Sequence, residues 1–167
     1  MATPILCFVG RSNSGKTTVI ERLIPELTRV GYRIATVKHA GHGFELDTEG
    51  KDSWRHKQAG ASAVVVLSKG SMAMFADVSE EIKVEEIRDR FLDSEIDLII
   101  AEGWKSEDYP KIAVVREHLG EVTVSTEGLL AIVSMKPIQS SVPCFDRDDI
   151  QNLAELIVRH YPKRHAP

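Results

Sequence analysis

Cysteine is scarce in this sequence, and so are apolar runs long enough to cross a membrane. The 167 residues include 2 cysteines, Cys7 and Cys144, which lie far apart and form no CxxC pair. Because Cys7 lies inside an apolar run, we expect it to be a buried, reduced thiol. No apolar run approaches the roughly 18 residues that a membrane span requires. The first predicted strand starts almost at Met1 and leaves no room for a signal peptide. The sequence therefore predicts a cytoplasmic protein.

A strong excess of charge of one sign is also absent. The chain has 21 Lys and Arg against 25 Asp and Glu, a formal net charge of −4, and its one short basic block is PKRH at residues 162–165. Binding to bulk nucleic acid or to an anionic membrane is therefore not expected. A hydrophobic fraction of 43% with 28% charged residues is typical of a globular protein, and 167 residues fit one ordinary domain.

Short apolar runs alternate with amphipathic stretches along the chain. The runs predict strands buried on both faces, and the amphipathic stretches predict helices. Strands are expected at residues 4–10, 32–40, 62–68, 96–103, 111–116 and 129–134, with a further one at 71–75. Because apolar strands alternate with helices, we expect an α/β fold, with a mainly parallel sheet and helices on both faces.

Four helices are expected between and after these strands. The first follows residues 10–18 and ends at Gly31, and a short one covers residues 52–60. A charged surface helix over residues 79–92 should turn Ile82, Ile87 and Phe91 inward. Asp149 should cap the last helix.

The stretch GRSNSGKT at residues 10–17 fills every fixed position of the pattern G-x-x-x-x-G-K-S/T, between a predicted strand and a predicted helix. In such a loop the backbone N–H groups turn toward phosphate oxygens, and the helix dipole favours negative charge. Lys16 would reach the β- and γ-phosphates of a nucleoside triphosphate, and the Thr17 hydroxyl would bind Mg²⁺. We therefore predict a single P-loop nucleotide-binding domain over residues 1–167, with a three-layer P-loop NTPase fold. The predicted nucleotide-binding residues are Gly10, Arg11, Ser12, Asn13, Ser14, Gly15, Lys16, Thr17 and Thr18.

The metal of such a site needs an acidic partner at the end of a neighbouring strand. Asp97 and Glu102 flank one predicted strand, and at ~3.3 Å per residue they lie on the order of 16 Å apart. Phosphates bind at the carboxyl ends of strands in open α/β sheets. We therefore assign Glu102 to the metal or to the attacking water, and Asp97 to a structural role at the surface. Lys16 and Glu102 are the predicted catalytic residues.

A polar loop over residues 39–53 leaves the carboxyl end of the second predicted strand and projects toward the same edge. Asp47 and Asp52 could join the metal through water, and Lys38 or Lys51 could meet phosphate. The predicted metal ligands are Thr17, Glu102 and Asp47.

Four stretches together resemble a known family. GRSNSGKTT, VKHAGHGFELDTEGKDSWRHKQAGA, LIIAEGWKSEDYPKIAVVR and VPCFDRDDIQNLAELI are similar to molybdopterin-guanine dinucleotide biosynthesis protein B (MobB), over essentially the whole chain. The glycine loop alone is common to a large superfamily, whereas the second and third stretches are much more specific. The resemblance implies a P-loop GTP-binding protein that forms a homodimer and acts with the guanylyltransferase that attaches GMP to molybdopterin. It also places Lys111 and Arg116 near the site or the dimer contact.

The sequence carries no motif that specifies the base. The tetrapeptide N/T-K-x-D, with which many GTPases recognise guanine, is absent. VSMKP at residues 133–137 occupies a plausible base-side position but offers no equivalent aspartate. The preference for GTP therefore rests on the resemblance.

Two other functions stay open at this point. A small-molecule kinase would need arginines that converge on the phosphates, whereas Arg88 and Arg90 are interleaved with acidic residues on a charged helix. A metal-delivery or adaptor GTPase would bind nucleotide to switch partners. The residues that could hold its metal fit no tight ligand pattern; they are His39, His42, His56 and Asp47.

No arginine in the sequence is clearly committed to the γ-phosphate; Arg11 and Arg55 are the candidates. Since such an arginine can be worth about 10³–10⁵ in rate, we expect slow GTP hydrolysis by the isolated protein. GTP and Mg²⁺ would then order the loop at residues 39–53, and the ordered surface would engage the guanylyltransferase.

Overall fold

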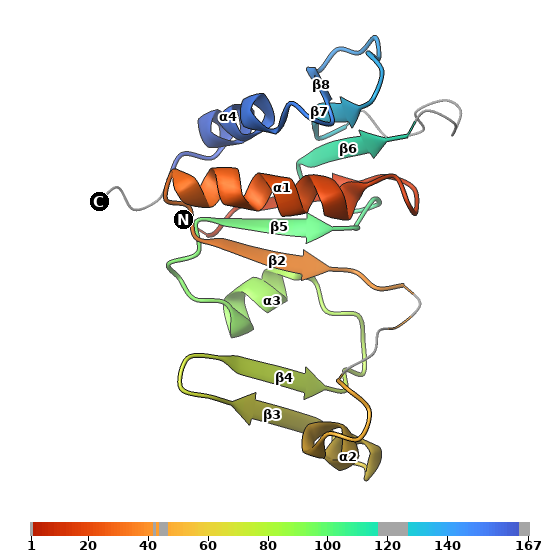
Figure 1. Cartoon of the computed structure of the whole chain (residues 1–167), viewed down its shortest axis with the longest axis vertical. Coiled ribbons are helices and arrows are strands. Elements are labelled where there is room, and N and C mark those ends of the chain that lie inside the picture. The colour runs from red at the N-terminus through yellow and green to blue at the C-terminus, as the bar shows by residue number, and fades with distance from the viewer. Residues whose placement is uncertain (1, 42, 44–46, 117–126, 164–167) are drawn as a thin grey trace. The chain divides into compact units, whose positions relative to one another are not determined.

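A computed structural model describes residues 2–41, 43, 47–116 and 127–163 of the chain (Figure 1). In chain order the elements are β1 (Ile5–Val9), α1 (Lys16–Arg29), β2 (Ile34–Lys38), α2 (Asp52–Gln58), β3 (Ala63–Leu67), β4 (Met72–Ala76), α3 (Val84–Phe91), β5 (Leu98–Glu102), β6 (Lys111–Val115), β7 (Leu129–Ser134), β8 (Cys144–Asp146) and α4 (Ile150–His160). They form two compact units, one made of the chain up to residue 39 and from residue 84 onward, the other of residues 40–83. The single domain over residues 1–167 stays a prediction.

The first unit is built on a six-stranded parallel sheet with the order β2-β5-β1-β6-β7-β8. This confirms the predicted α/β class and the parallel sheet. Phe8 of β1 pairs with Glu102 of β5, and Glu102 also pairs with Lys38 of β2. The carboxyl ends of these three neighbouring strands therefore meet at one edge. The sequence analysis missed β8, because its 3 residues are too few to show a pattern.

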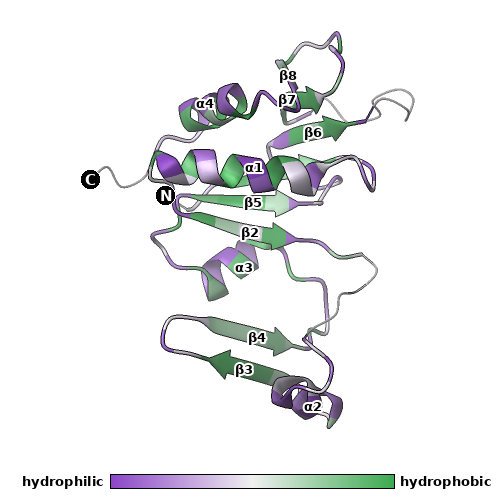
Figure 2. Ribbon diagram, viewed as in Figure 1, coloured by the Kyte–Doolittle hydropathy of each residue, from purple (hydrophilic) through white to green (hydrophobic). Residues whose placement is uncertain are grey.

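The sheet is covered on both faces, as a three-layer fold requires. Alternate residues of β1 point to opposite faces, so that Leu6 and Phe8 belong to one apolar cluster and Cys7 and Val9 to the other. The first cluster packs against α1 and α4, and the second includes Val84 of α3. Figure 2 shows that the strands of this sheet are mainly apolar, with polar positions at the end of β2 and the start of β6. At about 1.5–3 kcal/mol for each fully buried large side chain, this burial is the main stabilising term.

The second unit carries a two-stranded antiparallel hairpin, in which Val65 of β3 pairs with Met74 of β4. Both runs are strands as predicted, but the prediction that residues 62–68 are buried is wrong. Within β3 only Val64 is buried. Two strands form a sheet too small to bury both of its faces, and the apolar run therefore stays exposed among the described residues.

Two details of the predicted helices also need correction. Phe91 is 50% exposed rather than inward-facing, and Val84 is fully buried instead. The reason is that α3 begins at Val84, so its first turn contacts the sheet. Asp149 occupies the N-cap position of α4 as predicted, but its side chain makes no capping bond. Its Oδ1 accepts a hydrogen bond from the Asn152 side chain at 2.8 Å.

Both cysteines are free, and Cys7 is completely buried in the sheet, as predicted. Burial raises the pKa of the Cys7 thiol to about 12. Since the thiolate is the nucleophile, we expect Cys7 to resist iodoacetamide at about pH 8 in the native protein. It should become alkylated once guanidinium chloride unfolds the sheet. Peptide mass spectrometry measures this, with the half-buried Cys144 as internal comparison. Alkylation of native Cys7 at the rate of an unfolded thiol would contradict it.

Candidate nucleotide site

The loop over residues 10–15 connects β1 to α1, the first helix of the sheet unit. Gly15 is the N-cap of α1 with φ of 95°, a left-handed conformation that favours glycine. The Val19 N–H donates to the Gly15 carbonyl at 3.0 Å. The N–H groups of the residues between Gly15 and Val19 have no backbone acceptor one turn earlier in the helix. They therefore point out of the helix at the carboxyl edge of the sheet, where an anion can accept from them.

Both glycines are also required by close packing. A Cβ at Gly10 would collide with the backbone carbonyl oxygen of Val114, next to the end of β6. A Cβ at Gly15 would collide with the guanidinium of Arg147, which follows β8. The loop therefore lies between two neighbouring segments, and both positions exclude a side chain.

Lys16 folds back over this loop. Its Nζ donates to the carbonyl of Arg11 at 2.9 Å and to that of Gly10 at 3.3 Å. Partial burial lowers the pKa of Lys16, and the nearby carboxylate of Glu102 opposes that shift. The ammonium is thus held at the mouth of the loop, at the place where the phosphates of a nucleotide would need a cation.

The structure brings Thr17 and Glu102 together, although they are far apart in sequence. The Thr17 hydroxyl lies 3.1 Å and 3.3 Å from the two carboxylate oxygens of Glu102. Lys38 Nζ lies 3.9 Å from the same carboxylate, whose side chain is 15% exposed. A hydroxyl and a carboxylate are hard oxygen ligands of the kind that Mg²⁺ prefers. The donor set therefore fits a magnesium ion bound beside a triphosphate.

The loop also contains a buried polar atom that favours a ligand. Ser14 is 1% exposed, and its Oγ has no hydrogen-bond partner among the described residues. Buried hydroxyls are normally satisfied. A phosphate loop whose partner is a bound anion accounts for this exception.

Asp97 lies at the other end of β5 and has the structural role predicted for it. Its Oδ2 accepts the backbone N–H of Arg33 at 2.8 Å, just before β2. The prediction that it lies at the surface is wrong, since Asp97 is only 6% exposed. The bond orients the carboxylate where β2 and β5 begin, away from the phosphate loop.

Two arginines singled out from the sequence lie at the loop. Arg11 is part of it, and its carbonyl accepts from Lys16. Arg116, which follows β6, donates to the Asn13 carbonyl at 3.2 Å, whereas Lys111 is the first residue of β6, at the other end of that strand. Arg147 is new, and its position could not be inferred without β8. Arg55 lies in α2 of the second unit, 3.8 Å from Asp52.

Residues of the predicted functional loop beyond His39 belong to the second unit. There Asp47 accepts hydrogen bonds from the Ser53 hydroxyl and from the Thr48 N–H, and these two bonds lower its pKa. Lys51 is the N-cap of α2. The metal role of Asp47 stays a prediction, and His42 lies outside the described residues. No group of three or more candidate metal-ligating side chains occurs in the described part of the chain.

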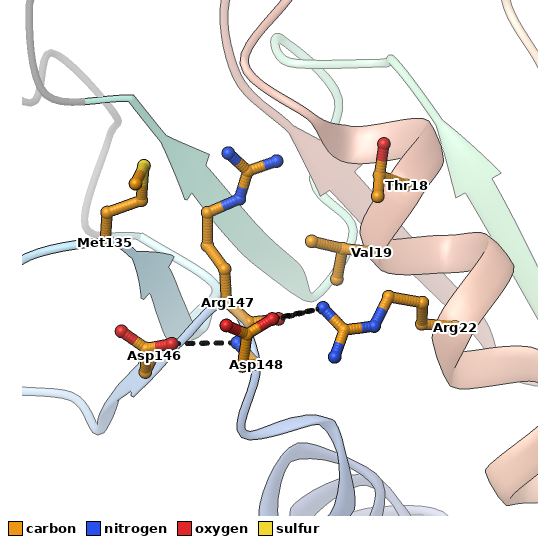
Figure 3. A pocket seen from close by; sticks show the side chains of 7 residues that line it. All are labelled: Thr18, Val19, Arg22, Met135, Asp146, Arg147 and Asp148. Atoms are coloured by element: carbon orange, nitrogen blue, oxygen red, sulfur yellow. Dashed lines mark hydrogen bonds and ion pairs between the residues drawn. The ribbon is translucent and has the colours of Figure 1, made fainter.

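A cavity of about 330 Å³ opens next to the phosphate loop (Figure 3). Arg22 is one of its lining residues and donates to Asp148 Oδ1 at 2.6 Å and to the Arg147 carbonyl at 3.1 Å. The Asp148 N–H in turn donates to Asp146 Oδ1 at 2.8 Å. The cavity is lined by Thr18, Val19, Arg22, Met135, Asp146, Arg147 and Asp148.

Comparison with known proteins gives a consistent result. The sequence profile of the family "Molybdopterin guanine dinucleotide synthesis protein B" matches residues 5–135. The molybdopterin-guanine dinucleotide biosynthesis adapter protein of Escherichia coli is 33% identical over 98% of this chain and 96% of its own. The Haemophilus influenzae protein of the same name is 34% identical, over 92% of this chain and 87% of its own. A nucleoside-triphosphatase of Thermococcus kodakarensis is 31% identical over 80% of this chain and 78% of its own.

Among solved structures, a crystal structure of molybdopterin-guanine biosynthesis protein B superposes with a TM-score of 0.78 at 35% identity, covering 95% of this chain and 99% of the other. In the described part of the present chain, no helix is long and apolar enough to cross a membrane.

Proposed function

Because the chain belongs to the molybdopterin guanine dinucleotide synthesis protein B family, we propose that it is a GTP-binding adapter in molybdenum cofactor biosynthesis. It binds GTP with Mg²⁺, hydrolyses it slowly, and as a homodimer engages the guanylyltransferase that completes molybdopterin guanine dinucleotide. The curated relatives are named as adapters of this biosynthesis, which supports an accessory role rather than a synthetic one.

The observation that carries this proposal is the contact between Thr17 and Glu102 beside Lys16. In this arrangement the N–H groups at the start of α1 and the Lys16 ammonium hold the triphosphate. Thr17 and Glu102 would hold the metal, which would supply positive charge to neutralise the charge that builds up on the phosphates. From the carboxyl end of β5, Glu102 would also orient the attacking water.

Slow hydrolysis follows from how the arginines are engaged. The Arg116 guanidinium donates to a backbone carbonyl of the loop, and Arg22 is paired with Asp148. Phosphoryl transfer is fast when an arginine stabilises the charge of the transition state. Neither of these two guanidinium groups is available for that role, so we expect hydrolysis to stay slow until a partner or the second subunit completes the site.

The contacts of α3 argue against the kinase alternative. Arg88 pairs with Asp89 at 2.6 Å, and Arg90 pairs with Glu86 at 3.7 Å. Both arginines are thus engaged with carboxylates of their own helix and do not form a cluster that could bind a phosphorylated substrate.

The exposed hairpin supports the proposed homodimer. One of its faces is formed by Val65, Leu67, Met72 and Met74, which are between 47% and 72% exposed. Each strand also pairs with only one neighbour among the described residues. Apolar faces and unpaired strand edges of this kind are normally covered, and a second copy of the hairpin is self-complementary to it.

Replacing Lys16 by alanine tests nucleotide binding. Loss of the Lys16 ammonium at the mouth of the loop should weaken GTP binding at least about tenfold, as measured by calorimetry. Lys69→Ala, in the exposed turn of the hairpin, is the control and should bind GTP like the wild type. Equal affinity of Lys16→Ala and wild type would refute the phosphate site.

Two charge-matched variants at opposite ends of β5 test the role of Glu102. Glu102→Gln should reduce GTP hydrolysis more than GTP binding, because an amide is a weaker ligand for the metal and for the water. Asp97→Asn should leave hydrolysis unchanged. Phosphate release at saturating GTP measures both, against a wild-type rate expected to be well below about one per second. A larger loss of hydrolysis in Asp97→Asn would reverse the assignment.

A charge on the hairpin face tests the dimer. Leu67→Glu should convert the dimer to a monomer, because the carboxylate would be buried without a partner. Sedimentation velocity measures the mass of the particle. Val30→Glu, at an exposed apolar position that follows α1, should remain dimeric. A Leu67→Glu variant that sediments like the wild type would exclude this face from the interface.

A further inference from the structure

The cavity next to the phosphate loop begins where the nucleotide-binding residues end. Thr18 and Val19 line it from the first turn of α1, directly after Lys16 and Thr17. Its other walls come from Met135, just after β7, and from the segment after β8 (Figure 3). A volume of about 330 Å³ is within the range of small-molecule sites. If the triphosphate lies on the loop, as proposed above, the rest of the nucleotide can reach this cavity.

The two carboxylates of the cavity are not equivalent. Asp148 forms an ion pair with Arg22 at 2.6 Å. Asp146, the last residue of β8, accepts the Asp148 N–H through Oδ1 at 2.8 Å. This bond orients the Asp146 side chain at the carboxyl edge of the sheet. Because an ionised carboxylate offers about four acceptor sites, Asp146 retains acceptor capacity toward the cavity.

Arg147 gives the same cavity a flat cationic wall. Its guanidinium extends along the cavity in Figure 3 and reaches Gly15 of the phosphate loop. A planar guanidinium stacks well on aromatic rings. The side chain of Met135, 54% exposed, adds a soft apolar surface.

We propose that this cavity is the base subsite and that Asp146 selects guanine. Guanine presents two adjacent donors, N1–H and the exocyclic amino group, and one carboxylate can accept from both. Adenine presents the N1 lone pair at the corresponding position, where it would face the negative charge and leave both groups unpaired. Arg147 stacks on the purine ring without choosing between bases. The aspartate that the segment after β7 lacks is thus supplied by the next strand.

The test is the binding of GTP, ATP and xanthosine triphosphate to wild type and Asp146→Asn, each with Mg²⁺, measured by calorimetry. The wild type should prefer GTP to ATP at least about tenfold, and Asp146→Asn should lose at least about tenfold in GTP affinity. The variant should gain in affinity for xanthosine triphosphate, because the new amide can donate to the carbonyl oxygen at C2 of xanthine. An amide oxygen can still accept the Asp148 N–H, so the turn after β8 is retained.

Asp89→Asn, on α3 and outside the cavity, is the charge-matched control and should keep the wild-type ratio of GTP to ATP affinity. Asp146→Glu keeps the charge but displaces it by one methylene, and it should lower the ratio without a gain in xanthosine triphosphate binding. It serves as the second variant should Asp146→Asn unfold.

The outcomes separate this inference from the proposed function on which it rests. Wild type that binds no triphosphate would overturn both. Wild type that binds GTP and ATP equally, or an unchanged GTP to ATP ratio in Asp146→Asn, would overturn the base assignment and leave the phosphate site standing. An equal change of the ratio in Asp89→Asn would also overturn it.

Discussion

The parallel pairing of β1 with β5 is the constraint on which the rest of the site depends. In this register Glu102 lies opposite Phe8, one residue before the end of β1. The chain then turns through the glycine loop and starts α1, which places the Thr17 hydroxyl at the Glu102 carboxylate. A sheet with the opposite pairing would put the carboxylate at the far edge. The apolar burial that fixes the sheet therefore also fixes the positions of Thr17 and Glu102, the proposed metal ligands.

Several charged side chains gather around the phosphate loop, and their charges do not cancel. Lys16 is partly desolvated, and Glu102 counteracts the resulting decrease in its pKa. Lys38 approaches the same carboxylate from β2. Arg116 and Arg147 flank the loop on its other side, through the Asn13 carbonyl and Gly15. Two cations near the Glu102 carboxylate and two more beside the loop make this region suited to an anionic ligand.

The hairpin unit differs from the sheet unit in leaving apolar strands exposed. Its strands are as apolar as those of the sheet (Figure 2), yet most of their side chains are exposed. A two-stranded sheet cannot form a core of its own, so this surface gains stability only from association. In the function proposed above, the sheet unit would bind the nucleotide and the hairpin would form the contact between two copies of the chain.

The sequence alone predicted five of the six strands of the sheet, the loop between β1 and α1, and that Glu102 rather than Asp97 lies at the carboxyl edge. Those features depend on local pattern and on the direction of a parallel strand, both of which can be read from neighbouring residues. Tertiary structure alone decided the exposure of β3, since its burial depends on how many strands pair beside it. It also decided the position of Arg147 and Asp146, because β8 is too short to show a pattern and becomes a strand only by pairing with β7.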